Sequence, residues 1–297
     1  CMVPQPHRWY EAMRKIDFIA VADLFMTPTM MALADVVLPA CTFPERNGIA
    51  FVSGAQRGST INKVTDVGEC RSDMQINLEL GKRWNPEAWP WENVEDMFTE
   101  MIASSGITFP ELREAAPVYL PFEYGKHEKG LLRPDGSPGF YTATGRIELW
   151  SFGYDHWGVD PLPYHIEPPE SPLSTPKTFE EFPLILSGGG RSFEFFHSEH
   201  RQIPHLRALH PNPEFEIAPE TAEEYGIGQG DWCWIESHLG RVQLKANVSP
   251  VLDPSTISLD HAWWFPERGP EDGTLFGVME SNINRLIPMR PGNVGLG

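Results

Sequence analysis

A glycine-rich turn followed by an arginine is the clearest candidate for ligand binding in this sequence. Residues 187–191, SGGGR, directly follow a β-rich run. Three glycines would let phosphate groups approach the backbone N–H groups of the turn, and Arg191 would add a positive charge. The turn matches neither of the common phosphate-binding patterns, GxxxxGK[ST] and GxGxxG, so an ordinary glycine turn is the alternative.

The segment 193–201, FEFFHSEHR, places two histidines, two acids and an arginine beside three phenylalanines. His197 and His200 are three residues apart and would share one face if the segment were helical. Two histidines without a third ligand are weak support for a metal site. We therefore prefer hydrogen bonding of His197 or Arg201 to an anionic or heteroaromatic ligand, and we assign no metal ligand and no catalytic residue.

Two later segments carry groups suited to a flat, base-like ligand. Residues 261–266 combine an imidazole with three aromatic rings, which could stack on a ring system or could fill the interior of the protein. Residues 281–284, SNIN, offer amide donors and acceptors, although asparagine in loops more often stabilises turns.

A strand, a helix and a second strand are predicted in succession near the N-terminus. The β-rich run 16–22 leads through Asp23 into a short helix at 30–34, and an apolar run at 35–39 ends at a proline. Such an apolar run is typical of a buried parallel strand, so this segment predicts a βαβ unit. Ligands of parallel sheets lie at the carboxyl ends of the strands, where Asp23 and residues 42–48 would be found.

The remaining elements divide the chain into two parts. Four prolines with acids and hydroxyls at 167–181 indicate an exposed linker, with an α/β domain at 1–166 before it and a domain rich in strands at 182–297 after it. In the first part we expect helices at 72–84, 94–102 and 111–116 and a loop at 117–139. In the second part we expect a small β-barrel with strands at 182–187, 231–236, 241–248 and 256–259 and a helix at 218–225.

Composition excludes several classes of protein. Asp and Glu number 41 against 23 Lys and Arg, and the resulting net charge of -18 disfavours nucleic acid as a partner. No run of about 18 apolar residues is present to span a membrane. The four cysteines are far apart in the sequence, so no cysteine cluster for zinc or iron–sulfur binding is present. The chain starts at Cys1 without a visible signal segment, so we expect truncated ends and a cytoplasmic location.

Taken together, these residues resemble the molybdopterin oxidoreductases of the dimethyl sulfoxide reductase family. The resemblance covers nearly all of the chain, and the order and spacing of its motifs are more specific than any single motif. It implies the end of a doubly wound α/β domain followed by a double-psi β-barrel, as in the C-terminal part of such enzymes. The matching stretches are 23–29, 34–39, 45–48, 71–73, 142–148 and 182–287.

The resemblance also implies the cofactor, molybdopterin guanine dinucleotide with molybdenum or tungsten. The iron–sulfur cysteines and the metal-ligating residue of the family would lie upstream of residue 1, so a fragment without them is expected to be inactive. The implied partners are the protein's own N-terminal domains and an electron-transfer subunit. Carried over from the family, the cofactor-binding residues are Ala22, Asp23, Arg46, Asp73, Gly189, Gly190, Arg191, His197, Trp264 or Phe265, and Asn284.

Three functions are compatible with these observations. The first is an oxidoreductase in which a metal–pterin cofactor performs the chemistry and the protein orients it. The segments 263–267 and 281–284 most resemble a branch of the family that includes a hydratase, so a non-redox hydration is the second. The third is a non-enzymatic β-barrel module that uses the same fold for protein contacts.

Overall fold

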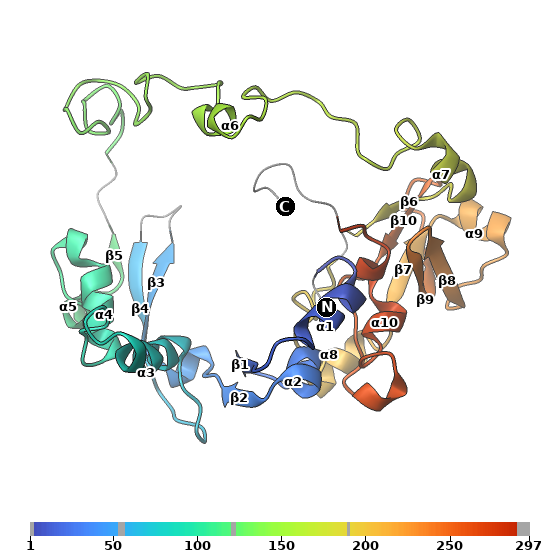
Figure 1. The fold of residues 1–297 in the computed structure, drawn as a ribbon, viewed down its shortest axis with the longest axis horizontal. Helices are drawn as coiled ribbons and strands as arrows, with labels where there is room; N and C mark the ends of the chain where they lie inside the picture. The colour runs from blue at the N-terminus through green and yellow to red at the C-terminus, as the bar shows by residue number, and fades with distance from the viewer. Residues whose placement is uncertain (1–2, 53–56, 120–122, 189–190, 290–297) are drawn as a thin grey trace. The chain divides into compact units, whose positions relative to one another are not determined.

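The computed structural model describes residues 3–52, 57–119, 123–188 and 191–289 (Figure 1). Contacts within the chain group it into two compact units. We call residues 20–26 and 35–151 the helix unit, and residues 1–19, 27–34 and 152–297 the sheet unit. This grouping differs from the boundary expected at 167–181, and the expected domain limits stay a prediction.

The predicted βαβ succession is confirmed. Strand β1 (Ala20–Asp23) pairs in parallel with β2 (Val36–Pro39), and Asp23 lies opposite Pro39. Helix α2 (Pro28–Leu33) comes between them in the chain and begins where the Thr27 hydroxyl accepts the N–H of Met30. The prediction that the second strand is buried is wrong for this structure. Val36 is 39% exposed because β1 and β2 form a two-stranded sheet to which no other described strand is added.

The helix unit also contains a three-stranded antiparallel sheet and three capped helices. The sheet joins β3 (Gly48–Val52), β4 (Arg57–Ile61) and β5 (Val118–Tyr119), and it was not predicted. The three predicted helices are confirmed, each starting after a residue whose side chain accepts a backbone N–H, namely Ser72, Asn93 and Thr108. They are α3 (Asp73–Trp84), α4 (Val94–Met101) and α5 (Phe109–Ala115), with the short 3-10 turns η1 (Phe43–Glu45) and η3 (Ala103–Ser105).

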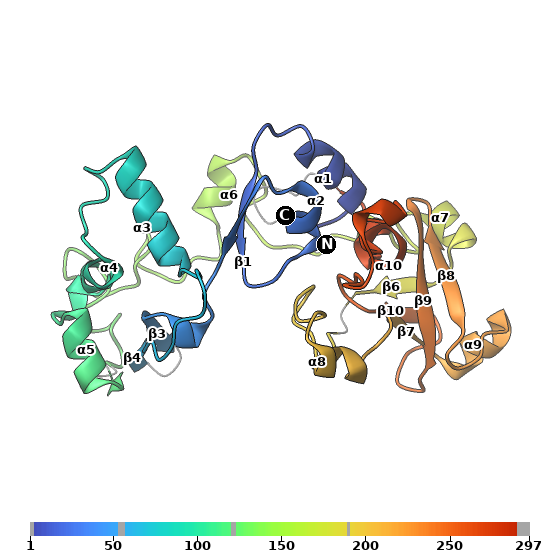
Figure 2. The same ribbon diagram turned by 90° about the horizontal axis from the view of Figure 1, so that it is seen from below.

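The sheet unit is built on a five-stranded mixed sheet (Figure 2). Its strand order is β6-β10-β7-β9-β8, with parallel pairs β6–β10 and β7–β9. Apolar residues that alternate along β7 and β9 form its core, for example Phe215, Ile217, Val242 and Leu244. The strands are β6 (Ile185–Ser187), β7 (Glu214–Ile217), β8 (Trp232–Ser237), β9 (Gly240–Val248) and β10 (Thr256–Leu259).

Short helices precede, connect and follow the strands of this sheet in the sequence of the sheet unit. Several begin with proline, which suits the first turn because it needs no N–H donor there. Helix α7 (Pro176–Glu181) lies inside the segment predicted as an exposed linker, so part of that segment is helical. The others are α1 (Pro6–Met13), α6 (Phe152–His156), α8 (Pro204–Leu209), α9 (Pro219–Tyr225), α10 (Val278–Ser281), η4 (Pro270–Asp272) and η5 (Ile283–Arg285).

The fold is therefore mixed α/β, as predicted. In the described ranges no helix has the length and apolar character needed to cross a membrane.

Candidate functional site

Two loops of the sheet unit leave the same edge of the sheet and meet in a small polar pocket. Because β6 and β10 run in parallel, with Ser187 opposite Ser258, the chain that follows each strand starts at the same edge. We call this site the Arg–His pocket. It is lined by Arg191, Ser192, Phe195, His197, Arg201, Asp260 and His261.

Two histidines form the centre of the Arg–His pocket. His197 Nδ1 and His261 Nε2 are 3.2 Å apart, within hydrogen-bonding distance, so one ring can donate to the other. Burial lowers the pKa of His261, and the charges of His197, Arg191 and Arg201 lower it further. An anion added to this pocket would be stabilised by the neighbouring arginines, Arg191 and Arg201.

Arg201 lies buried beneath the pocket, with only 2% of its surface exposed. Its guanidinium donates to the carbonyl oxygens of His197 (2.9 Å) and His261 (3.0 Å). The guanidinium carbon lies 4.8 Å from the centre of the Phe195 ring and 4.6 Å from that of Trp263. Burial lowers the pKa of Arg201 to about 9.

The backbone around the pocket adopts unusual conformations. His197, His200 and Ala262 have φ values of 52°, 69° and 50°, in the left-handed region that non-glycine residues rarely occupy. The segment with His197 and His200 is therefore a turn, so the shared helical face considered for the two histidines does not form. Such strained residues are often found at binding sites, where the surrounding structure holds them.

An ion pair between His210 and the pocket-lining Asp260 supports the pocket. His210 Nε2 lies 2.8 Å from Asp260 Oδ2, and the same oxygen accepts the N–H of Glu214. This hydrogen bond with Asp260 is the main reason that the pKa of His210 is raised. The sequence analysis missed this pair, although the position of Asp260 directly after a predicted strand was a signal that could have pointed to it.

The structure gives mixed outcomes for the other residues predicted in this unit. Trp264 and Phe265 are 1% and 6% exposed, so their rings fill the interior, and ligand contact through them stays a prediction. The Trp264 indole donates to the Ser198 carbonyl, which ties it to the loop of the pocket. Asn284 is also buried, and its carbonyl accepts the N–H of Gln5. Gly189 and Gly190 lie outside the described residues.

In the helix unit, three chain segments meet at the carboxyl ends of β1 and β2. Asp23 ends β1 and lies opposite Pro39, and Ala40 forms a parallel bridge with Arg71, two residues before Asp73. One carboxylate oxygen of Asp23 accepts the N–H groups of Leu24 (2.7 Å) and Phe25 (3.4 Å). Asp73 is exposed in the first turn of α3, and Ala22 is exposed on β1. The predicted acids Asp23 and Asp73 therefore belong to neighbouring strand ends.

Arg46 is half-buried beside Gly48 at the start of β3. Its Nη1 lies 2.8 Å from the position that a Cβ on Gly48 would occupy, so glycine makes room for the guanidinium. No carboxylate of the described residues forms an ion pair with Arg46. This leaves its charge available to an anion.

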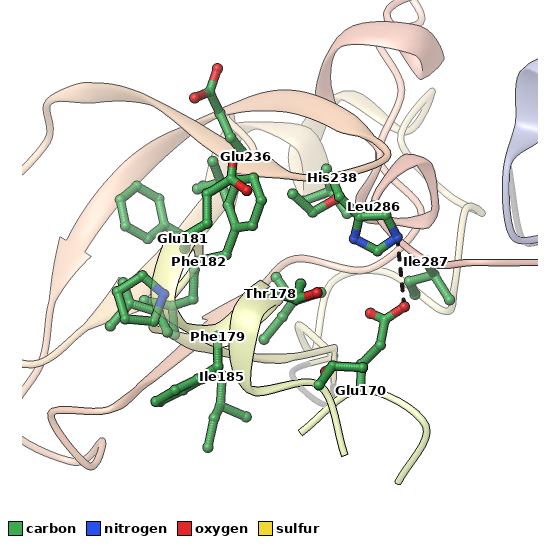
Figure 3. Close-up of a pocket in the computed structure, with 18 of the residues that line it drawn as sticks. Glu170, Thr178, Phe179, Glu181, Phe182, Ile185, Glu236, His238, Leu286 and Ile287 are labelled. Atoms are coloured by element: carbon green, nitrogen blue, oxygen red, sulfur yellow. Dashed lines mark ion pairs between the residues drawn. The ribbon is translucent and has the colours of Figure 1, made fainter. Parts of the chain in front are cut away.

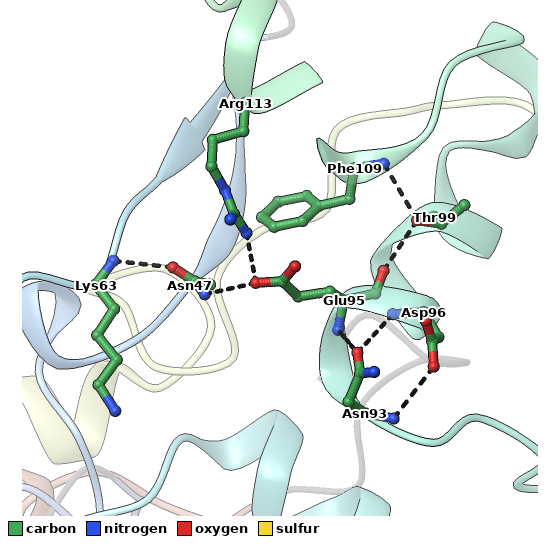
Figure 4. Close-up of polar contacts among 8 residues, drawn as sticks. All are labelled: Asn47, Lys63, Asn93, Glu95, Asp96, Thr99, Phe109 and Arg113. Carbon is green, nitrogen blue, oxygen red and sulfur yellow. Dashed lines mark hydrogen bonds and ion pairs between the residues drawn. The ribbon is translucent and has the colours of Figure 1, made fainter. Parts of the chain in front are cut away.

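Asn47, between Arg46 and Gly48, is held by a polar network (Figure 4). Asn47 Nδ2 donates to Glu95 Oε1 (2.8 Å), and Asn47 Oδ1 accepts the backbone N–H of Lys63 (2.9 Å). Arg113 pairs with the same Glu95 oxygen. The network ties the Arg46 segment to helices α4 and α5.

A cavity of about 700 Å³ in the sheet unit is mostly apolar and lies elsewhere (Figure 3). Side chains from α7, such as Phe179, face residues of the core sheet such as Phe215 and Ile257. An ion pair between His238 and Glu170, 3.7 Å apart, crosses its border. None of the residues predicted to bind the cofactor lines this cavity.

No group of three or more His, Cys, Asp or Glu side chains in the described residues is arranged to hold a metal ion. The side chains of the two sites suit recognition of a ligand. Cations and N–H donors suit phosphates, and carboxylates suit the donor edges of a base or a ribose.

Comparisons with known proteins agree with this character. The family model Molybdopterin oxidoreductase matches residues 3–83, and the model Molydopterin dinucleotide binding domain matches residues 184–293. Together they match well over half of the chain, and each contains one of the two sites described above.

Several relatives match most of the chain. It is 32% identical to acetylene hydratase from Syntrophotalea acetylenica, over 90% of the chain and 36% of that protein. It is 28% identical to dopamine dehydroxylase from Eggerthella lenta, over 94% of the chain and 34% of that protein. The solved structure of acetylene hydratase from Pelobacter acetylenicus matches with a TM-score of 0.83 and 29% identity, covering 96% of this chain and 38% of that one. The chain thus spans about a third of the length of these relatives.

Proposed function

Because this chain belongs to the molybdopterin oxidoreductase family, we propose that it is the cofactor-binding C-terminal portion of a molybdenum or tungsten oxidoreductase. The cofactor would be a pair of molybdopterin guanine dinucleotides. The observation that carries this proposal is the Arg–His pocket, in which arginine and histidine side chains from two separate loops converge at one sheet edge. The two family models favour this interpretation over a non-enzymatic module.

The side chains of the Arg–His pocket suit a phosphate-bearing group in their chemistry, and because the pocket itself has a volume of only about 10 Å³, such a group would lie over its opening rather than inside it. Arg191 and the His197–His261 pair supply donors, and Arg201 is a buried cation to which no described carboxylate is bonded. Asp260 is the carboxylate that lines the pocket, and it is hydrogen-bonded to His210, so an anion would add counter-charge beside Arg191 and Arg201. In the proposal Arg191 and His197 hold a phosphate or pterin edge, backbone N–H groups of Gly189 and Gly190 add to them, and Asn284 provides an amide.

The residues of the helix unit fit the nucleotide end of the cofactor. Guanine and ribose present N–H and O–H donors, which carboxylates accept. In the proposal Asp23, next to Ala22, accepts from guanine or ribose, Asp73 closes the same pocket, and Arg46 binds phosphate. Support comes from the meeting of the Asp23 and Asp73 segments at neighbouring strand ends and from the unpaired charge of Arg46.

The finer description of the fold belongs to the same proposal. We expect the helix unit to be the end of a doubly wound α/β domain and the sheet unit to be a double-psi β-barrel. Support comes from the match of the chain to the acetylene hydratase structure. The metal centre, once bound, would supply the redox or hydration chemistry, and this chain would orient and retain it.

Further features are proposed for the whole protein. About two thirds of the length of these relatives lies outside the part that this chain matches. We expect the metal-ligating residue and any iron–sulfur cluster in that part, an electron-transfer subunit as a partner, and a cytoplasmic location.

A hydratase is the second candidate function. Acetylene hydratase matches this chain both in sequence and in structure, and its name describes the addition of water rather than electron transfer. The tryptophans at 263–267 and the amides at 281–284 could contact the cofactor in an oxidoreductase and in a hydratase. These residues therefore do not separate the two functions.

An activity comparison on the full-length protein tests the proposal. Purified anaerobically, it should turn over with an artificial electron donor or acceptor in proportion to its molybdenum or tungsten content. Product formation from acetylene without any electron acceptor would instead support the hydratase. The absence of both activities in a preparation that is fully loaded with metal would contradict both candidate functions.

A further inference from the structure

Arg201 occupies a position that direct ligand binding does not explain. Sequence analysis treated it as a candidate donor to an anionic ligand. In the structure its two terminal nitrogens are already engaged by the carbonyl oxygens of His197 and His261, 2.9 Å and 3.0 Å away, and it is 2% exposed. Arg201 lines the pocket, but with both terminal nitrogens bonded to the backbone it offers a ligand less than the turns that it holds.

Both turns held by Arg201 are conformationally strained. His197 itself has φ 52°, and Ala262, which follows His261, has φ 50°. Residues in this region cost free energy and persist only where the surroundings fix them. A planar guanidinium with two parallel donors can bridge two carbonyls that one ammonium group would not span with the same geometry.

The consequence of this bridge is the convergence of donors from two loops. Holding the His197 turn against the His261 turn brings His197 Nδ1 to 3.2 Å from His261 Nε2. Arg191 lines the same pocket. The rings of Phe195 and Trp263 lie 4.8 Å and 4.6 Å from the guanidinium carbon and keep it from turning away.

We propose that Arg201 is a positioning residue that clamps the His197 and His261 turns together and so builds the pocket for a phosphate-bearing cofactor. This inference rests on the proposed function, since it assumes that the Arg–His pocket holds such a group. Arg201 acts through the two turns and does not itself touch the cofactor.

Variants at two neighbouring arginines provide a matched test in the full-length protein. Arg207 also packs on the Trp263 ring, at 5.0 Å, but it donates to the exposed Glu267 and does not bridge the two turns. We would compare Arg201→Lys, Arg201→Met and Arg207→Met for the pterin bound per polypeptide and for the thermal unfolding midpoint.

If Arg201 acts as a clamp, replacing it should reduce cofactor retention by more than the change in the thermal unfolding midpoint explains. Arg201→Met and Arg201→Lys should each weaken pterin retention by about tenfold or more. Arg207→Met should retain the cofactor at the wild-type level even if it lowers the unfolding midpoint as much. Added guanidinium ion at low concentration should restore part of the cofactor binding to an Arg201→Gly variant and should not affect the wild type.

Two outcomes overturn the inference. If Arg201→Lys retains cofactor as the wild type does, positive charge alone is sufficient and no clamp is needed. If Arg201→Met and Arg207→Met lose cofactor equally and in step with their unfolding midpoints, the role of Arg201 is only structural. If the wild-type protein itself contains no pterin, the proposed function fails first, and this result is distinct from both.

Discussion

At the scale of single residues, the account depends on cations that have no carboxylate partner in the described part of the chain. Arg46 and Arg201 are each at least half-buried, and neither forms an ion pair there. Other arginines of the chain, such as Arg268 with Glu280, are paired in the usual way. A buried or half-buried charge without a partner is costly unless a ligand completes it. Arg46 therefore marks a place where an anion is expected, whereas Arg201 donates to two backbone carbonyls and acts through the turns that it holds.

Replacing Gly48 by alanine tests the placement of Arg46. A Cβ at this position would lie 2.8 Å from Arg46 Nη1, and the flexible guanidinium would move aside. We expect the free energy of unfolding to change by less than about 1 kcal/mol, since the backbone φ of Gly48 is not in the left-handed region. Pterin retention by the full-length protein should fall by about tenfold.

Gly58→Ala is the control for this experiment. Gly58 lies on the neighbouring strand β4, where a Cβ would make only ordinary contacts, 3.7 Å from Leu112 Cδ1. Cofactor content should be unchanged in this variant. Equal cofactor content in the two alanine variants would show that the position of Arg46 is unimportant.

The His210–Asp260 pair predicts a pH-dependent contribution to stability. The raised pKa of His210 means that the folded protein holds this proton more tightly than the unfolded chain does. The stabilisation is fully present below the unfolded pKa of about 6.5 and is lost as the pH rises through the folded pKa. His210→Gln should therefore cost about 1–2 kcal/mol at acidic pH and progressively less as the pH rises.

Urea unfolding of His210→Gln at several pH values measures this effect. His165→Gln serves as a control because the His165 side chain is 83% exposed. A penalty for His210→Gln that is the same at pH values below 6.5 and well above it would contradict the ion-pair explanation.

At the scale of elements, sequence reasoning worked where a local signal was strong. Ser72 predicted the start of α3 because its side chain caps the helix, and Pro39 marked the end of β2. Strand β7 (Glu214–Ile217) was missed because two of its four residues are glutamates and its stability comes from pairing with β9 and β10. Local propensity carries no information about such non-local pairs.

The candidate site was predicted by residue type but not by geometry. Arg191, His197 and His261 drew attention because of their side chains, and parallel strand ends explain why they meet. The clamp by Arg201 depends on backbone carbonyls, which have no signature in the sequence. Trp264 and Phe265 illustrate the opposite problem, because aromatic residues near a site are as well suited to the interior as to a ligand.

The packing of α3 depends on a glycine within the helix. A Cβ on Gly81 would overlap the indole of Trp89, and Gly81 is buried. We expect Gly81→Ala to destabilise the protein by about 1–3 kcal/mol, as overpacking usually does.

A double-mutant cycle with Trp89→Ala tests that explanation by thermal or urea unfolding. Without the indole, alanine at position 81 should be neutral or stabilising, because alanine favours helices by up to about 1 kcal/mol over glycine. The same penalty in both backgrounds would rule out the contact with Trp89 as the cause.

At the scale of the whole molecule, the two units carry complementary chemistry. The helix unit presents acids and one arginine at strand ends, and the sheet unit presents arginines and histidines at strand ends. Each unit contains most of the region matched by one of the two family models. The strong acidity of the whole chain makes the cationic pocket a local exception, which supports binding of a specific anion rather than general attraction of anions.

The most direct test of the central claim is to measure the cofactor that the full-length protein releases when it is denatured. We would measure the molybdenum or tungsten and the guanine nucleotide released per polypeptide. The account predicts one metal atom and two guanine nucleotides for each fully loaded polypeptide. A protein that is folded and expressed under metal-replete conditions, yet releases neither metal nor guanine nucleotide, would contradict it.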